Sequence, residues 1–199
     1  MPKPLLSARY RLVVRDAQGK IIRIEEAPSK SFILNFLYMW WLTLNLNASD
    51  SLSMVTYYGS PYAYSPYQPM GWWTFVNREP YSGEQVGSGT SSPSASSPYL
   101  ESLILSGTGS GQLSYGPNIV TSPSLSSNPG TMTVTKTFTN NSGGTVTVGE
   151  IGLATQVYLP NAASSTNNAA LMIHDVLPSV ANVPNGGTIT VTYTLVVNT

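Results

Sequence analysis

The chain of 199 residues contains no cysteine, which excludes a disulfide framework and a thiolate metal site. It has a single histidine, His174, and its nine acidic residues are scattered along the sequence. Because metal sites need several such ligands close together, we expect no bound metal and no cofactor. Asp175 follows His174, but neighbouring residues of a strand point to opposite faces. We therefore expect a structural or interface role for His174, without a relay to Asp175.

Charged residues are also scarce, at 9% of the chain against about 25% in ordinary soluble domains. A surface so poor in charge is better suited to being covered by other subunits than to keeping monomers apart. Seven basic and three acidic residues give the first thirty positions a net charge of +4, and two basic and six acidic residues give the remainder −4. This polarity could orient head-to-tail contacts between copies or turn the basic N-terminal segment toward nucleic acid. It is equally compatible with two solvated strand faces.

No apolar run reaches the roughly 20 residues of a membrane-spanning helix. The most hydrophobic stretch, residues 32–44, is shorter and is interrupted by Asn35 and Thr43. Its apolar residues have helical spacing and follow two serines that suit a helix cap, so we predict a buried or interface helix and no membrane span. A buried strand-like segment and a membrane segment are the alternatives. Residues 1–9 lack the apolar core of a secretory signal peptide, which predicts that the chain is not exported by that route.

Catalytic signatures are missing as well, and we expect no enzymatic activity. Two pairs of carboxylates, Glu101 with Glu150 and Glu79 with Glu84, have the chemistry of a glycosidase, but nothing in the sequence places either pair across a cleft. The glycine-rich residues 107–111 lack the lysine and the helix of a phosphate-binding loop, so they are predicted to form a turn.

The clearest positive signal is strict alternation of apolar and polar residues, which is typical of β-strands. It covers residues 131–139, 145–153 and 188–197, and residues 8–15 and 20–26 form a predicted N-terminal hairpin. Shorter strands are predicted at 72–77, 100–105 and 112–115, and the Gly/Ser-rich residues 83–98 are predicted to form a flexible surface loop. The expected fold is mainly β: a β-sandwich or jelly roll preceded by the hairpin and the hydrophobic segment. We divide the chain into residues 1–50 and 51–199, joined as one compact unit.

Residues 57–81 are rich in tyrosine, proline and tryptophan, and the prolines are incompatible with a regular central strand. Such an aromatic loop can anchor contacts between subunits, stack on sugar rings or cover an edge of the chain's own sheet. Together with the hydrophobic segment it supplies the candidate subunit interface: Phe36, Trp40, Trp41, Tyr62, Tyr64, Tyr67, Trp72 and Trp73.

Two blocks of sequence carry a resemblance to known proteins. They are FTNNSGGTVTVGEIGL at residues 138–153 and NGGTITVTYTL at residues 185–195, with His174-Asp175 between them. In this succession the chain resembles virion structural proteins of tailed phages and other prokaryotic viruses, a group that often carries an Arg-Asp pair at the position of His174-Asp175. The resemblance covers most of the chain. It implies a β-rich component of the capsid shell, a decoration or the tail, made in the host cytoplasm and located in the virion.

The expected function is therefore self-assembly, in which strand edges and aromatic residues are buried against copies of the same chain and against other virion proteins. Two alternatives belong to other classes. One is a carbohydrate-binding or receptor-binding module whose aromatic loop faces solvent, and the other is an extracellular filament subunit built by strand exchange.

Overall fold

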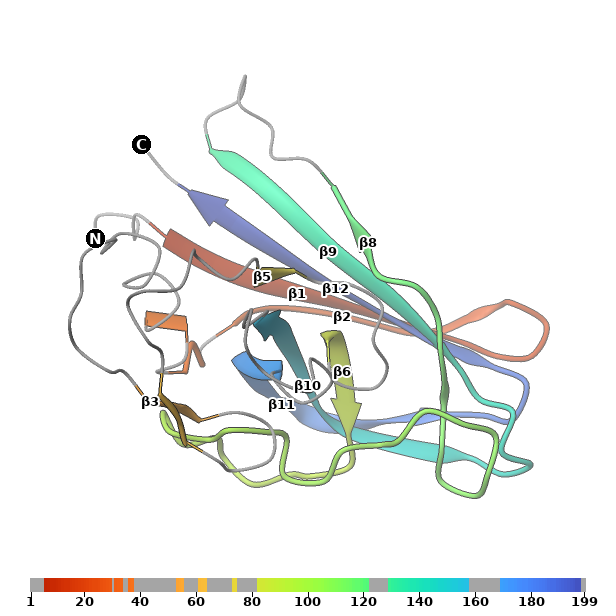
Figure 1. The fold of residues 1–199 in the computed structure, drawn as a ribbon. Helices are drawn as coiled ribbons and strands as arrows, with labels where there is room; N and C mark the ends of the chain where they lie inside the picture. Colours follow the sequence, from red (N-terminus) through yellow and green to blue (C-terminus); the bar gives the residue numbers. More distant parts are fainter. Residues whose placement is uncertain are drawn as a thin grey trace.

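The computed structural model describes residues 6–29, 31–33, 36–37, 53–55, 61–63, 73–74, 82–121, 129–157 and 169–197. Over these residues the chain is mainly β, with two antiparallel sheets and a short two-stranded ribbon (Figure 1). The prediction of a mainly β fold is confirmed.

The larger sheet has six strands in the order β2-β1-β12-β9-β7, and β8 also pairs with β9. Every pairing in it is antiparallel. Its strands are β1 (Leu6–Arg15), β2 (Ile21–Pro28), β7 (Ser114–Tyr115), β8 (Ile119–Val120), β9 (Gly130–Thr139) and β12 (Thr188–Val197). Because β1 lies beside β12, the two segments predicted as 1–50 and 51–199 contribute to one sheet.

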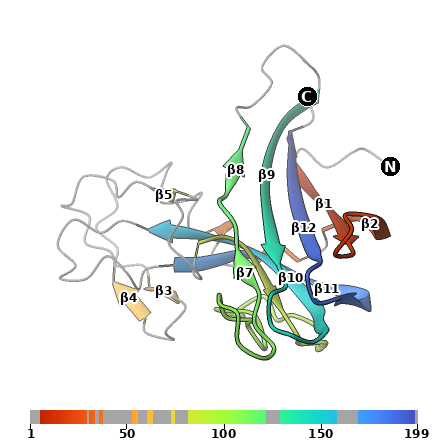
Figure 2. The ribbon, with the colours of Figure 1, turned by 90° about the vertical axis from the view of Figure 1, so that its right-hand side faces the viewer.

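The smaller sheet is centred on β10 (Val146–Val157), which pairs with β11 (Ala169–Val183) on one side. On its other side β10 pairs with β6 (Gly83–Gly87) and β5 (Trp73–Thr74). The ribbon consists of β3 (Ser53–Val55) and β4 (Pro61–Ala63). Figure 2 shows the long strands of the larger sheet running at a large angle to β10 and β11.

The two sheets share one hydrophobic core, to which alternate residues of each long strand contribute. In β12 the buried residues Ile189, Val191 and Tyr193 point into this core, whereas the threonines between them point away. The opposite face of the smaller sheet is covered by residues 88–105 and carries a second cluster of Ile33, Leu100, Ala154 and Leu171.

The predicted N-terminal hairpin is confirmed, since β1 and β2 pair in an antiparallel register. Its turn depends on Asp16, whose side chain accepts hydrogen bonds from the backbone N–H groups of Gln18 and Lys20. Gly19 has a φ of 80°, a left-handed conformation that favours glycine. The sequence signals that predicted this turn are thus the residues that form it.

Three local predictions were wrong or incomplete. Residues 83–98 were predicted as a flexible loop, but Gly83–Gly87 forms a fully buried strand, β6, in which a Cβ at Gly87 would overlap the Glu150 side chain of β10. Residues 100–105 were predicted as a strand but contain turns, with only an isolated bridge between Leu103 and Gly87. The 15-residue strand β11 was not predicted, because its N-terminal half is buried on both faces and lacks alternation.

The predicted helix at 32–44 is not confirmed. Residues 31–33 are extended beside β11: the N–H of Ile33 donates to Met172 O, and the N–H of His174 donates to Ser31 O. Only Phe36 and Leu37 have helical geometry, and the rest of this segment lies outside the described residues. Among the described residues, no helix is long and apolar enough to cross a membrane.

Candidate functional site

Of the predicted interface residues, the structure describes the side chain of Phe36 and the backbone of Tyr62 and Trp73. Phe36 is buried, and its ring packs on Phe32 at 4.7 Å between centroids, so the chain already covers this side chain itself. Tyr62 lies in β4 and Trp73 in β5, where the backbone alone is described. The remaining candidates lie outside the described residues: Trp40, Trp41, Tyr64, Tyr67 and Trp72. The aromatic interface therefore stays a prediction.

Exposed apolar residues gather instead at both edges of the larger sheet. At one edge, β2 carries Ile21, Ile22 and Ile24, of which Ile24 is 52% exposed. At the other edge, Ile119 of β8 is 59% exposed and Val120 is 46% exposed. In the described part of the chain no further strand pairs with β2 or β8, so both edges combine apolar side chains with open backbone hydrogen-bonding groups.

The face of the larger sheet that points away from the core, hereafter the outer face, is lined by threonine hydroxyls. Antiparallel pairing of β9 with β12 sets four threonines of each strand opposite one another, beginning with Thr139 and Thr188. Two of these cross-strand pairs are hydrogen-bonded through their Oγ1 atoms: Thr135 with Thr192 at 3.0 Å and Thr137 with Thr190 at 2.9 Å. The outer face is thus polar yet almost without charge over these two strands.

Positive charge on the outer face comes from β1. Arg9, Arg11 and Arg15 alternate with buried residues and are exposed. Two of them are partly engaged within the hairpin: Arg11 Nε forms an ion pair with Glu26 at 2.7 Å, and Arg15 Nη1 donates to Gly19 O. Contact of this basic segment with nucleic acid stays a prediction.

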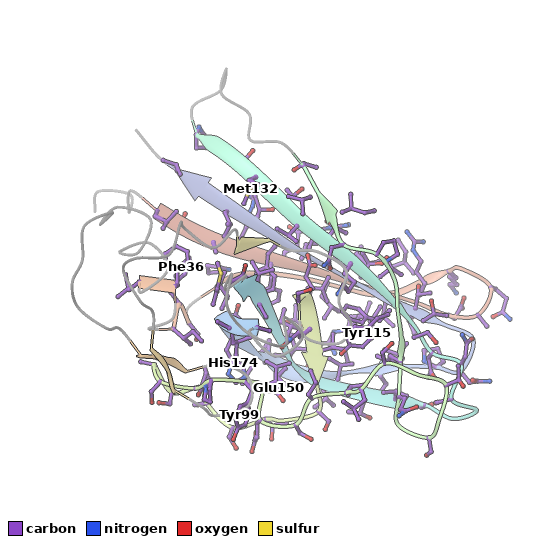
Figure 3. All side chains as sticks on the ribbon, viewed as in Figure 1. Phe36, Tyr99, Tyr115, Met132, Glu150 and His174 are labelled. Atoms are coloured by element: carbon purple, nitrogen blue, oxygen red, sulfur yellow. The ribbon has the colours of Figure 1, made fainter. Side chains whose placement is uncertain are left out.

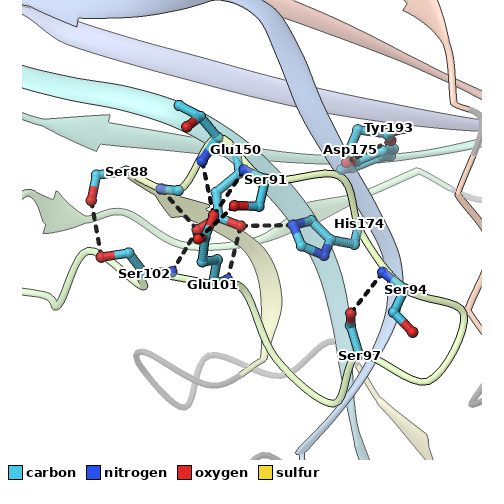
Figure 4. Close-up of polar contacts among 12 residues, drawn as sticks. Ser88, Ser91, Ser94, Ser97, Glu101, Ser102, Glu150, His174, Asp175 and Tyr193 are labelled. Atoms are coloured by element: carbon cyan, nitrogen blue, oxygen red, sulfur yellow. Dashed lines mark hydrogen bonds and ion pairs between the residues drawn. The ribbon is translucent and has the colours of Figure 1, made fainter.

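The most concentrated polar cluster lies under residues 88–102, on the face of the smaller sheet opposite the shared core (Figure 4). Its centre is Glu150 of β10, whose side chain is completely buried. The carboxylate accepts hydrogen bonds from the backbone N–H groups of Gly89, Glu101 and Ser102 at 3.1, 2.9 and 2.7 Å, and its Oε2 lies 2.7 Å from His174 Nε2. The Glu150 side chain therefore holds residues 88–102, hereafter the covering segment, against the smaller sheet.

Hydrogen bonding decides the charge state of Glu150. Burial by itself raises the pKa of this carboxyl, but the hydrogen bonds from His174 and from the backbone of Ser102 and Glu101 more than compensate. The net pKa is lowered, so Glu150 is an anion at neutral pH. The same reasoning applies to Glu101, whose pKa is lowered by hydrogen bonds from Ser91 and Thr90.

His174 and Asp175 make no relay, as the alternation of the strand predicts. His174 points to Glu150 beneath the covering segment, whereas Asp175 points to the other face and accepts a hydrogen bond from Tyr193 Oη at 3.1 Å (Figure 4). The structure does bring Glu101 and Glu150 together (Figure 4), and Figure 3 shows Glu150 and His174 within the whole chain. The oxygens of Glu150, however, accept hydrogen bonds from the chain's own backbone. This arrangement is that of a structural anchor rather than a pair of glycosidase carboxylates. Glu79 lies outside the described residues.

Two ionisable residues, Lys136 and Glu84, are fully buried, which the sequence analysis did not predict, although Glu84 was named there with Glu79 as a candidate carboxylate. A signal for Lys136 was present: it occupies the apolar phase of β9, between Val134 and Phe138. Glu84 gave no such signal, because the surrounding sequence was interpreted as a loop. Among the described residues, no group of three His, Cys, Asp or Glu side chains could hold a metal ion.

Comparisons with models of protein families, with curated proteins and with solved structures found no match. The functional argument therefore depends on the geometry of the chain itself.

Proposed function

We propose that this chain is a structural protein of a virion, in the shell, a decoration or the tail, which assembles with copies of itself. In this proposal the two sheets form a β-sandwich of the jelly-roll type. The observation that carries the proposal is the exposed apolar residues at both edges of the larger sheet: Ile21, Ile22 and Ile24 on β2, and Ile119 and Val120 on β8.

Two properties of these edges support contact between copies. A monomer usually protects its edge strands with charge, proline, bulges or covering segments, because open edges pair with other chains. The β2 edge has three exposed isoleucines, although Arg23, Glu25 and Glu26 lie among and after them. The β8 edge has an exposed Ile-Val pair without a charged residue within it. Because the two edges differ, joining β2 of one copy to β8 of the next is a heterologous contact, which produces rings or extended arrays.

Low charge supports the same conclusion. Nine basic and nine acidic residues in 199 leave little long-range repulsion between copies. Apolar burial at about 25 cal/mol per Å² then exceeds what exposed ion pairs contribute, since such pairs are worth roughly 0 to 1 kcal/mol each. We therefore propose that burial of the apolar side chains at these two edges drives assembly.

The experiment compares single charge insertions at the edges with a matched insertion elsewhere. Ile24→Lys and Ile119→Lys each place an ammonium group on an edge, whereas Leu105→Lys places one at a residue that is 50% exposed but belongs to neither edge. Assembly of the purified proteins is followed by sedimentation velocity and electron microscopy. We expect each edge variant to weaken association at least about tenfold, equivalent to 1.4 kcal/mol, and the Leu105→Lys protein to assemble as the parent does.

Circular dichroism verifies that the variants retain their β structure. A parent chain that stays a single monomeric species at high concentration contradicts the proposal. Monomers that bind glycans would favour the carbohydrate-binding alternative, and unchanged particles from both edge variants would rule out the edges as the site of contact.

A further inference from the structure

A cluster of three side chains, Lys136, Asn118 and Glu84, lies beneath the edge of the larger sheet that carries β8. Lys136 of β9 points into the shared core between Val134 and Phe138 and is fully buried. Its Nζ donates a hydrogen bond to Ser82 O at 3.0 Å and lies 5.3 Å from the centre of the Tyr115 ring. A lysine is almost never fully buried without a specific reason, because removing its charge from water is costly.

Asn118 reaches the same point from the segment that precedes β8. Its Nδ2 donates to the same oxygen, Ser82 O, at 3.3 Å. Because Lys136 Nζ and Asn118 Nδ2 both donate to Ser82 O, the two nitrogens lie close to each other. The amide of Asn118 also occupies the space where a side chain at Gly83 would begin: a Cβ there would lie 2.1 to 2.3 Å from the amide atoms. Glycine at this position thus leaves room for the amide inside the fold.

Glu84 completes the cluster. It follows Gly83 in β6, is fully buried, and neither of its carboxyl oxygens has a hydrogen-bond partner. Burial raises its pKa to about 8, although its own backbone N–H and the charge of Lys136 act in the opposite direction. The Glu84 carboxyl has no hydrogen-bond partner, is mostly protonated at neutral pH and interacts electrostatically with Lys136. It can therefore exchange protons with the Lys136 amine.

We propose that Lys136 and Asn118 join in an amide cross-link between their side chains, formed by the chain itself with Glu84 as the proton carrier. In the fraction of chains in which Glu84 is ionised, transfer of a proton from the Lys136 ammonium to its carboxylate leaves a neutral amine beside a protonated Glu84. Nζ attacks Cγ of Asn118, the new C–N bond forms, and the bond from Cγ to Nδ2 breaks. Glu84 gives its proton to the departing nitrogen and accepts one from Nζ, so it is regenerated and one ammonia leaves. No oxidant, metal or other reagent is required.

The surroundings favour this reaction for reasons that apply to buried amines in general. A desolvated lysine is a stronger nucleophile than a hydrated ammonium group. Holding amine and amide together converts a bimolecular reaction into an intramolecular one, which can be worth effective concentrations of about 10⁵ M or more. The product would tie β9 covalently to the segment before β8, at one edge of the larger sheet.

The test uses the full-length chain and trypsin. Lys136 is the only basic residue after Arg78, so complete digestion of an unlinked, denatured chain releases residues 137–199 as a separate peptide. A Lys136 side chain converted to an amide is no longer a site for trypsin. The expected result is therefore a single product spanning residues 79–199, lighter than its sequence mass by one ammonia, in which tandem mass spectrometry of a chymotryptic digest locates the linkage between Lys136 and Asn118.

Three variants assign the roles. Lys136→Arg retains the positive charge but should be cut at that position and show the full sequence mass. Asn118→Asp should link with loss of one water instead of one ammonia, and an ammonia loss in this variant would contradict the assignment of Asn118. Glu84→Gln should fold but remain unlinked. Release of residues 137–199 from the folded and then denatured parent chain, at the full sequence mass, would overturn the proposal, as would an ammonia loss that maps to another asparagine.

Discussion

At the scale of single residues, Glu150 has the clearest structural consequence. A buried carboxylate is expensive unless charged or polar partners surround it, and Glu150 has four of them. Three are backbone N–H groups of the segment that covers the smaller sheet. Loss of the charge would therefore affect that segment as well as the side chain itself.

We predict that Glu150→Gln lowers the free energy of unfolding by about 3 kcal/mol, because it weakens several buried charge-assisted hydrogen bonds at once. Urea denaturation measures the change. Glu101→Gln is the matched control: the side chain of Glu101 is exposed, so we expect a clearly smaller loss. Equal losses in the two variants would contradict the anchoring role of Glu150.

The same residue predicts how stability depends on pH. The pKa of Glu150 is lower in the folded chain than its ordinary value of 4.5. Its stabilising contribution is therefore fully present above about pH 4.5 and is lost as the pH falls through the lower, folded-state value. Urea midpoints measured from pH 7 down to pH 3 should decline more steeply for the parent chain than for Glu150→Gln.

At the scale of elements, close approach of backbones fixes the covering segment on β10. A Cβ on Gly149 would lie 2.4 Å from the carbonyl oxygen of Gly89, a distance that no side-chain rotation can relieve. Gly144 lies five residues earlier, in the turn that precedes β10, and a Cβ there would meet nothing within 4 Å.

We predict that Gly149→Ala destabilises the chain by roughly 1 to 3 kcal/mol through this overlap, whereas Gly144→Ala leaves stability almost unchanged. Thermal unfolding followed by circular dichroism compares the two variants with the parent. Because each variant adds the same methyl group to the same stretch of sequence, similar melting temperatures would show that the segment can move away from Gly149.

The elements differ in how well the sequence predicts them, and burial explains the difference. β9, β12 and the first hairpin have one face in the core and one in water, so alternation reveals them. The N-terminal half of β11 and all of β6 are buried on both faces, which removes the alternation, and β6 also contains two glycines. Strands of this kind become visible only when their neighbours are known.

The polar sites also differ in how well the sequence predicts them. The separate orientations of His174 and Asp175 were predictable from the period of a strand. The partners of Glu150 were not, because they are backbone groups of a segment more than 45 residues away in the sequence. Lys136 was predictable in part, since it interrupts an apolar series on one face of β9. Its neighbours were not, because Glu84 lies in a segment predicted as a loop and no element was predicted at Asn118.

At the scale of the whole molecule, neutrality predicts how the proposed assembly responds to salt. Charged residues are few and sum to zero over the whole chain, so screening them removes little attraction or repulsion. Contact through apolar edges is strengthened by salts that are excluded from protein surfaces. We predict that the assembled fraction changes little between low and high sodium chloride and rises in ammonium sulfate, as measured by light scattering. Dissociation by sodium chloride alone would indicate that ion pairs hold the copies together.

The position of β1 between β2 and β12 also governs the order of events during synthesis. Residues 6–28 are synthesised before the other strands of their sheet, and the strand that completes their side of the sheet, Thr188–Val197, is made about 160 residues later. Until then the hairpin exposes the apolar face of β1 to solvent, and closing so long a loop is slow. The apolar face of β1 is therefore most open to aggregation between the synthesis of the first hairpin and that of the last strand, and a chaperone would be needed most in this period.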